Sequence, residues 1–139
     1  MRHFFHGHTF TGNPLAAATA ITNLELYKKN KLIPKIKQNS KRFEKRIGEI
    51  KNLSLVGDVR HKGMLMGIEL VSDKKKKTPI KPEKSIPKKI FAEAKRHKIY
   101  LRTLGHIVML VPPLAISASE LEFLLDGTID TIKKVTKEV

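Results

Sequence analysis

The stretch that decides the fold is Met64-Leu65-Met66-Gly67-Ile68-Glu69-Leu70-Val71. Apolar side chains occupy every second position from Met64 to Leu70, which is the two-residue period of a β-strand. Three of the four positions between them are also uncharged: Leu65, Gly67 and Val71. The alternation therefore predicts a strand that is buried on one face and mostly covered on the other.

Helical and strand patterns alternate on both sides of this stretch. Apolar residues recur at helical spacing in some segments, whereas short apolar runs bounded by glycine or proline mark others. The expected elements are helices at 14–29 and 31–50, β-structure at 53–72, a loop at 73–85, a helix at 86–97, a β-hairpin at 99–111 turned at Gly105-His106, and a last helix from the capping box Ser117–Glu120. Helices packed on a mainly antiparallel sheet predict an α+β fold.

Each expected helix has one apolar stripe, which should face a core. The stripe of the first helix is Ala17, Ala20, Ile21, Leu24 and Tyr27, and a plain core helix of an independent domain would look the same. The later stripes are Leu32, Ile36, Phe43, Ile47 and Ile50; Ile86, Ile90, Phe91 and Ala94; and Leu121, Leu124, Leu125, Ile129, Ile132 and Val135. Gly127 costs the last helix about 1 kcal/mol relative to alanine, so we expect this helix to depend on packing.

Composition limits the function classes. The 139 residues include no cysteine, which excludes disulfides and thiolate metal sites, and no apolar run long enough to span a bilayer. The expected location is therefore the cytoplasm, with no membrane partner. The formal net charge of +15 raises nucleic-acid binding as an alternative. Lysine far outnumbers arginine and no nucleic-acid-binding motif occurs, so we expect the lysines on solvated helix faces and in the loop at 74–77.

A glycine-containing loop, His6-Gly7-His8-Thr9-Phe10-Thr11-Gly12-Asn13-Pro14, precedes the first helix. Asn13-Pro14 suits an N-cap followed by the first helical position. A glycine loop with hydroxyl groups that runs into a helix N-terminus is a plausible anion site, although a plain surface loop has the same pattern. His3, His6 and His8 match no common zinc spacing, so we expect no metal site.

Arg102 is the charged residue in the first strand of the expected hairpin. That strand has two faces by alternation, one with Tyr100, Arg102 and Leu104 and the other with Leu101 and Thr103. A guanidinium inside an apolar strand needs a carboxylate, because an isolated buried charge is costly. The carboxylate is either one of the chain, such as Asp58 or Glu69, or that of a substrate held by a bidentate fork. Arg60, beside a turn, is expected to pair with Asp58 or Glu69.

Three segments, in matching order, resemble the class III pyridoxal-phosphate aminotransferases. Residues 6–16 resemble the segment after the family's lysine-bearing loop. Val59 to Leu70 resembles its small-domain hairpin, and Tyr100 to Val108, with Leu110 to Leu114, resembles its substrate-carboxylate strand and the following turn. Within the family, the resemblance is to members that transfer an amino group from S-adenosylmethionine to 8-amino-7-oxononanoate, giving 7,8-diaminononanoate for biotin synthesis.

The resemblance implies a fold-type I architecture with pyridoxal 5'-phosphate as cofactor. Residues 31–139 would form the small C-terminal domain, and residues 1–30 would form the end of the large cofactor domain and the connecting helix. Thr9, together with His8, would bind the cofactor phosphate of the neighbouring subunit in a homodimer.

The resemblance also assigns substrate binding to Gly7 and Arg102, with Arg102 holding the carboxylate of the keto acid. It identifies no catalytic residue here, because the family's Schiff-base lysine, its aspartate at the pyridine nitrogen and its glycine-serine phosphate loop lie upstream of these segments. We therefore expect the C-terminal part of an aminotransferase, inactive without the N-terminal portion. A split or frameshifted gene, a late internal start or an artificially shortened chain would each produce it.

Three alternatives stay open. In the first, the complete enzyme is another class III aminotransferase, acting on ω-amino acids or ornithine derivatives, or it takes its amino group from lysine in place of S-adenosylmethionine. In the second, the chain is a stand-alone module that pairs with a separately encoded N-terminal portion. The third alternative is a basic nucleic-acid-binding protein.

Overall fold

The structure is a computed structural model that describes residues 6–81 and 84–138. The chain divides into two compact units, Met1–Ile33 and Pro34–Val139. His3, one of the three histidines considered for a metal site, lies outside the described residues. The assignment of residues 1–30 to a large cofactor domain and of residues 31–139 to a small domain stays a prediction.

The first unit contains α1 (Pro14–Lys29), which begins as its sequence predicts. The Oδ1 atom of Asn13 accepts hydrogen bonds from the N–H groups of Leu15 and Ala16 at 3.0 and 3.1 Å, and Pro14 occupies the first helical position. No residue of α1 is buried. The described residues therefore do not bury the apolar stripe of α1, and its assignment as a connecting helix or as a plain core helix stays a prediction.

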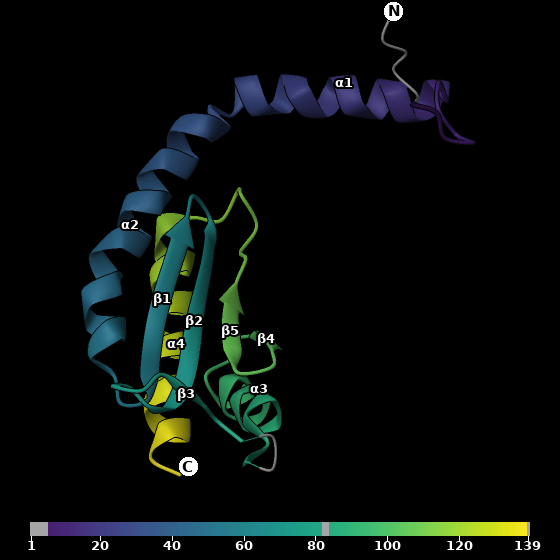
Figure 1. Ribbon diagram of the computed structural model, residues 1–139. Coiled ribbons are helices and arrows are strands. Elements are labelled where there is room, and N and C mark those ends of the chain that lie inside the picture. Colours follow the sequence, from purple (N-terminus) through teal and green to yellow (C-terminus); the bar gives the residue numbers. More distant parts are fainter. Residues whose placement is uncertain (1–5, 82–83, 139) are drawn as a thin grey trace, which may run out of the picture. The chain divides into compact units, whose positions relative to one another are not determined.

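The described residues of the second unit form helices on an antiparallel sheet, which confirms the predicted α+β fold (Figure 1). The elements are α2 (Leu32–Asn52), β1 (Val56–Lys62), β2 (Leu65–Asp73), β3 (Thr78–Pro79), α3 (Ile86–Arg96), β4 (Arg102–Leu104), β5 (Ile107–Leu110) and α4 (Ala118–Thr136). The strand order is β1-β2-β5-β4, and β3 pairs with β2. Figure 1 shows α4 behind β1 and β2.

The strand register gives the sheet two different faces, because residues directly opposite each other point to the same side. One row across the four strands consists of Val59, Ile68, Val108 and Thr103. The next row, on the opposite side, consists of Arg60, Gly67, Met109 and Arg102. We call the side of the first row the core face and the side of the second row the open face.

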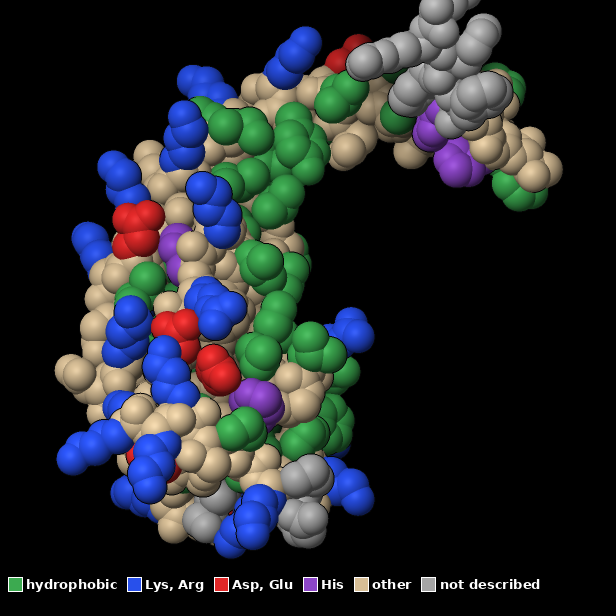
Figure 2. All heavy atoms as spheres, viewed as in Figure 1, with side chains coloured by type: hydrophobic (Ala, Val, Ile, Leu, Met, Phe, Trp, Pro, Cys, Tyr) green, Lys and Arg blue, Asp and Glu red, His purple; other side chains and the backbone are tan. Residues whose placement is uncertain are grey.

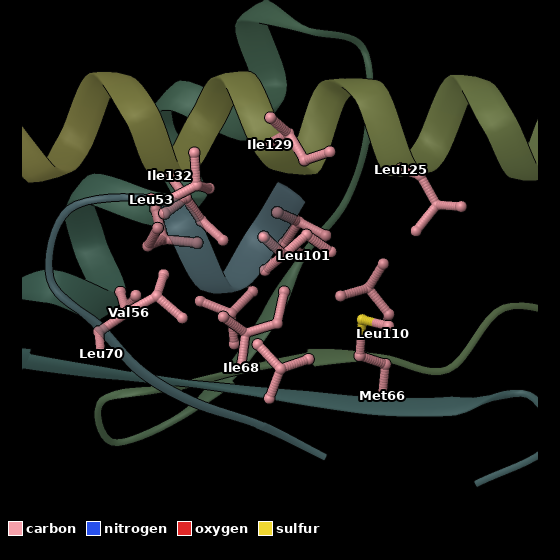
Figure 3. Close-up of a cluster of buried hydrophobic side chains, with 14 of the residues drawn as sticks. Leu53, Val56, Met66, Ile68, Leu70, Leu101, Leu110, Leu125, Ile129 and Ile132 are labelled. Atoms are coloured by element: carbon pink, nitrogen blue, oxygen red, sulfur yellow. The ribbon is translucent and has the colours of Figure 1, made fainter. Parts of the chain in front are cut away.

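The helices of the second unit bury the core face. In Figure 3, Leu125, Ile129 and Ile132 of α4 point toward the side chains of the sheet, among them Ile68 and Leu110. Residues from α2 and α3 join the same buried cluster, namely Phe43, Ile50, Ile86, Ile90 and Ala94. The apolar stripes predicted for α4 and for α2 from Ile36 onward are confirmed, with Ile36, Ile47 and Leu124 only partly buried. Leu32 at the start of α2 does not join the buried cluster.

Two glycines permit close packing in this unit. A Cβ atom at Gly127 of α4 would lie 2.9 Å from Cδ1 of Ile99, so the end of the Ile99 side chain would have to shift to accept it. A Cβ atom at Gly57 would lie 2.6 Å from Cγ1 of Val71. The expectation that α4 depends on packing is therefore confirmed at Gly127, which is itself buried.

Two expectations need correction. Phe91 is expected to face the core from α3, but 43% of it is exposed. The loop expected at 73–85 contains the short strand β3, which pairs with β2. Lys74 is exposed as predicted, and its ammonium also donates hydrogen bonds to the carbonyls of Lys51 and Leu53 at 2.8 and 3.0 Å. Lys74 thereby satisfies carbonyls at the end of α2 that have no partner within the helix. Lys75 to Lys77 remain exposed, as predicted.

Candidate functional site

Arg102 lies on the open face of the sheet and is exposed. The premise that this guanidinium is buried inside an apolar strand is therefore wrong. The predicted alternation of its strand is confirmed, because Leu101 is buried with 3% exposure while Tyr100 and Leu104 are 74% and 69% exposed. The backbone thus turns Leu101 into the core and presents the side chains on either side of it to solvent.

An apolar hollow of about 450 Å³ surrounds Arg102. Its lining residues are Tyr100, Arg102, Leu104, Met109 and Val111. Arg102 is the charged member of this lining, and the other side chains are an aromatic ring and aliphatic or thioether groups. A guanidinium in such surroundings suits a ligand that has an anionic end and an apolar body, since the fork binds a carboxylate and the walls cover methylene groups.

The carboxylates considered as internal partners of Arg102 are engaged elsewhere. Asp58 Oδ2 accepts a hydrogen bond from Nε of Arg60 at 2.9 Å. Oxygen atoms of Glu69 lie 4.0 Å from Nη2 of Arg60 and 3.4 Å from Nε2 of His106. The predicted pairing of Arg60 is therefore confirmed. Among the described residues, no salt bridge or hydrogen bond engages the side chain of Arg102. The alternative in which Asp58 or Glu69 pairs with Arg102 is therefore wrong.

The paired charges form a second cluster on the open face, in a hollow of about 160 Å³ lined by Asp58, Arg60, Gly67, Glu69 and Ile107. The hydrogen bond from Arg60 lowers the pKa of Asp58 below its ordinary value, and a hydrogen bond from the Val59 N–H adds to this effect. In Figure 2, acidic and histidine side chains lie next to one another on the surface, beside hydrophobic side chains. The open face therefore has two neighbouring regions. In one, the charged side chains neutralise one another; the other is apolar and contains the guanidinium of Arg102, which has no partner among the described residues.

Gly7, His8 and Thr9 lie together in the exposed loop before α1. The N–H of His8 donates to Oγ1 of Thr11 at 3.0 Å, and the N–H of Thr11 donates to the carbonyl of His8 at 2.9 Å, so the loop is a closed turn. Within the described part of the chain, no hydrogen bond engages the hydroxyl of Thr9, which leaves it able to donate to an anion. The helix N-terminus is a weaker anion site than the sequence suggests, because Asn13 already accepts from its first N–H groups.

The predicted site residues belong to both units of the chain. Gly7, His8 and Thr9 belong to the first unit, whereas Arg102 belongs to the second. The rings of His6 and His8 are 4.9 Å apart in an edge contact. Within residues 6–81 and 84–138, no cluster of three or more histidine, cysteine or acidic side chains gathers as a metal site would require.

The sequence analysis did not assign the walls of the hollow around Arg102. Tyr100 and Leu104 could have been found, because they lie two residues before and after Arg102 and so share its face. Met109 and Val111 depend on the pairing of β4 with β5, which places Met109 directly opposite Arg102. No pattern within one segment reveals that register.

Basic side chains are spread over the surface in Figure 2. Some are engaged in structural ion pairs: Arg42 and Arg46 of α2 contact Glu122 of α4 at 3.1 Å, and Arg46 contacts Asp126 at 2.6 Å. These pairs join two helices and are unavailable for phosphate. A search of the described residues for a helix long and apolar enough to cross a bilayer finds none.

Comparison with known proteins identifies the family. The aminotransferase class-III family profile matches residues 1–132. An adenosylmethionine-8-amino-7-oxononanoate aminotransferase of Geobacter sulfurreducens is 41% identical over 136 residues, which are 98% of this chain and 30% of that protein. The enzyme of the same name from Aquifex aeolicus is 37% identical over 138 residues.

Solved structures agree with these sequence matches. The crystal structure of adenosylmethionine-8-amino-7-oxononanoate aminotransferase from Methanocaldococcus jannaschii has a TM-score of 0.85 at 37% identity, covering 94% of this chain and 30% of that one. A PMP-bound aminotransferase from Vibrio fluvialis has a TM-score of 0.88 at 28% identity, covering 99% and 30%. The chain thus spans about 30% of the length of the relatives it matches, and it belongs to the class III aminotransferase family.

Proposed function

We propose that this chain is the C-terminal, substrate-binding part of a pyridoxal-phosphate-dependent aminotransferase of biotin synthesis. The complete enzyme would transfer an amino group from S-adenosylmethionine to 8-amino-7-oxononanoate, giving 7,8-diaminononanoate, in the cytoplasm and as a homodimer. The observation that carries the proposal is the guanidinium of Arg102, which lies in an apolar hollow and has no partner among the described residues. The keto acid has the matching shape, with a carboxylate at the end of an alkyl chain.

Arg102 would orient the keto acid from its distant end. A bidentate, charge-assisted contact fixes both the position and the direction of a carboxylate, and apolar walls cover the methylene groups that follow it. Holding the far end of a substrate places its reacting carbonyl in a defined position, which lowers the entropic part of the barrier. Arg60 would not compete for the carboxylate, because it is neutralised by Asp58 at 2.9 Å.

The residues present fit one part of the cofactor site. Thr9 offers an exposed hydroxyl that no hydrogen bond among the described residues engages, which suits a phosphate oxygen of the neighbouring subunit's cofactor. The lysines of the chain are exposed apart from half-buried Lys89, whose ammonium donates to the carbonyl of Glu138 at 3.1 Å. None has the desolvated environment that cofactor attachment requires. When bound, pyridoxal 5'-phosphate supplies the electron sink for amino transfer. This chain would supply orientation and a phosphate contact.

The test uses a chimeric enzyme in which this chain follows the part of the Geobacter sulfurreducens relative that it does not match. Production of 7,8-diaminononanoate is measured with S-adenosylmethionine or lysine as donor. We expect Arg102→Ala to raise the KM for the keto acid about tenfold to a hundredfold, since a hydrogen bond to a charged group contributes ~1.5–3 kcal/mol. The KM for the amino donor should change little.

Arg60→Ala is the matched control, because Arg60 lies in the same cross-strand row of the open face but is already paired. We expect its keto-acid KM to stay within about twofold of the parent value, as for other exposed substitutions. Equal effects of the two substitutions would show that Arg102 is not the carboxylate-binding residue. An active chimera that aminates other ω-oxo acids but not 8-amino-7-oxononanoate would favour the alternative of a different class III aminotransferase.

The role of Thr9 is tested by cofactor retention in the same chimera. We expect Thr9→Ala to lose pyridoxal phosphate faster on dialysis, followed by the cofactor's absorbance, because one phosphate hydrogen bond is removed. Thr9→Ser keeps the hydroxyl and should retain the cofactor like the parent. Equal retention by the alanine variant and the parent would remove Thr9 from the site.

A further inference from the structure

Three side chains form a contact ladder beside the hollow around Arg102. The rings of Phe91 and Tyr100 lie 5.7 Å apart at 84°, which is an edge-to-face contact. The ammonium of Lys95 lies 5.6 Å from the centre of the Phe91 ring. The ladder Lys95–Phe91–Tyr100 thus runs from the outer side of α3 to the wall of the hollow.

This ladder does little for the core. Phe91 is 43% exposed and Tyr100 is 74% exposed, so both rings leave most of their apolar surface in water. The backbone next to Tyr100 is anchored independently, because Leu101 is 3% exposed in the core. Fixing an exposed ring in this way restricts its rotamers without burying much area. The consequence is a preformed aromatic wall beside the guanidinium of Arg102.

We infer that Tyr100 determines specificity for the length of the alkyl chain attached to the carboxylate held by Arg102, and that Phe91 is a positioning residue for the Tyr100 ring. This inference rests on the proposed function, since it takes Arg102 as the carboxylate-binding residue. The Tyr100 ring covers methylene groups on one side of the hollow, and Met109 and Val111 cover them from β5 and the residue after it. A longer chain gains contact with these walls, whereas a short acid reaches only the guanidinium.

The chain offers a direct reporter for this inference. It contains no tryptophan and two tyrosines, Tyr27 and Tyr100. Replacing Tyr27 by phenylalanine leaves Tyr100 as the sole tyrosine, which can be labelled as 3-fluorotyrosine and followed by fluorine NMR. The probes are butanoate, hexanoate and octanoate, which share the carboxylate and differ in methylene number.

We expect the Tyr100 resonance to shift saturably, with affinity rising about twofold to fourfold for each added methylene group. Phe91→Leu should flatten this dependence on length, because the ring is no longer held, while Phe91→Tyr should restore it. Arg102→Ala should abolish saturable binding of all three acids. In the chimeric enzyme, Tyr100→Ala should raise the KM for the keto acid about tenfold but leave the KM for the amino donor unchanged, and Tyr100→Phe should behave like the parent.

The outcomes separate this inference from the proposed function. Binding that depends on Arg102 but is equal for all three acids would overturn the role of Tyr100 and leave the proposed function standing. The absence of any saturable shift would also overturn the inference, while the chimera assay judges the proposed function separately. An unchanged length dependence in Phe91→Leu would remove Phe91 as the positioning residue.

Discussion

The two faces of the same sheet differ in what determines their side chains. On the core face, Ile68 of β2 lies between Val59 and Val108 and is fully buried under the helices. On the open face, the next row holds two arginines, a glycine and a methionine, and the nearby Leu65 is 44% exposed. The strands and their period are common to both faces. The contrast shows that packing against the helices requires apolar residues on the core face. The residues of the open face are not required by packing against these helices.

The largest expected effect comes from exchanging a residue on each face for alanine. Ile68→Ala removes a fully buried side chain from the central strand, so we expect it to lower the free energy of unfolding by ~2–5 kcal/mol. Leu65→Ala, in the same strand but on the open face, should cost about 1 kcal/mol or less. Urea unfolding followed by circular dichroism measures both variants, and similar losses would contradict the distinction between the faces.

A smaller effect should follow from adding a methyl group where the backbone of β1 approaches β2. Gly57→Ala would place its Cβ 2.6 Å from the stiff Val71 side chain, so we expect a loss of about 1–3 kcal/mol. Gly48→Ala in α2 is the matched control, because a Cβ there meets nothing within 4 Å. It should raise stability by roughly 0.5–1 kcal/mol through helix propensity. Thermal melts compare the two, and a stabilised Gly57→Ala would show that β1 adapts.

The smallest of these effects concerns the start of α4, which contributes to the core face. The Ser117 side chain accepts from the N–H of Glu120 at 3.2 Å, and the Glu120 carboxylate accepts from the N–H of Ser117 at 2.9 Å, so the predicted capping box is confirmed. We expect Ser117→Ala to lower the free energy of unfolding by about 1 kcal/mol at neutral pH.

The capping box should also depend on pH. The hydrogen bond from the Ser117 hydroxyl, followed by that from its N–H, lowers the pKa of Glu120 below its ordinary value. A lowered folded-state pKa means that the contribution is complete above the unfolded-state pKa and is lost as the pH falls through the folded-state value. The difference in melting temperature between Ser117→Ala and the parent should therefore narrow in acid, while the part due to the Glu120 N–H bond remains. A constant difference would argue against the carboxylate's part in the box.

Much of the fold follows from local patterns in the sequence. The helix starts at Asn13-Pro14 and at Ser117, the turn at Gly105 and the alternation around Arg102 are all confirmed, since each depends on residues within a few positions. The pairing of Arg60 with Asp58 or Glu69 was also predicted, and the structure shows Asp58, two residues away, 2.9 Å from Nε of Arg60. These features need no knowledge of distant parts of the chain.

Other features could not be predicted because they depend on contacts between distant segments. Phe91 fits the apolar stripe of α3, yet it is directed to Tyr100, since the position of β4 relative to α3 decides which side of the helix is covered. In the sequence, Lys74 is one of four equivalent lysines. Its hydrogen bond to the end of α2 could not be predicted, because it depends on where that helix lies. The hollow around Arg102 needed the register between β4 and β5.

The sequence alone therefore determined the elements other than β3, the caps at Asn13 and Ser117, the α+β class and the resemblance to class III aminotransferases, because periodicity and local hydrogen bonding act over a few residues. Only the tertiary structure decided that Arg102 is exposed and without a carboxylate partner among the described residues, and that aromatic and aliphatic side chains line the hollow around it. The physical reason is that strand pairing determines the face of the sheet on which each side chain lies and the side chains of other strands that lie next to it. A charge is free for a ligand only when every possible partner has been placed elsewhere.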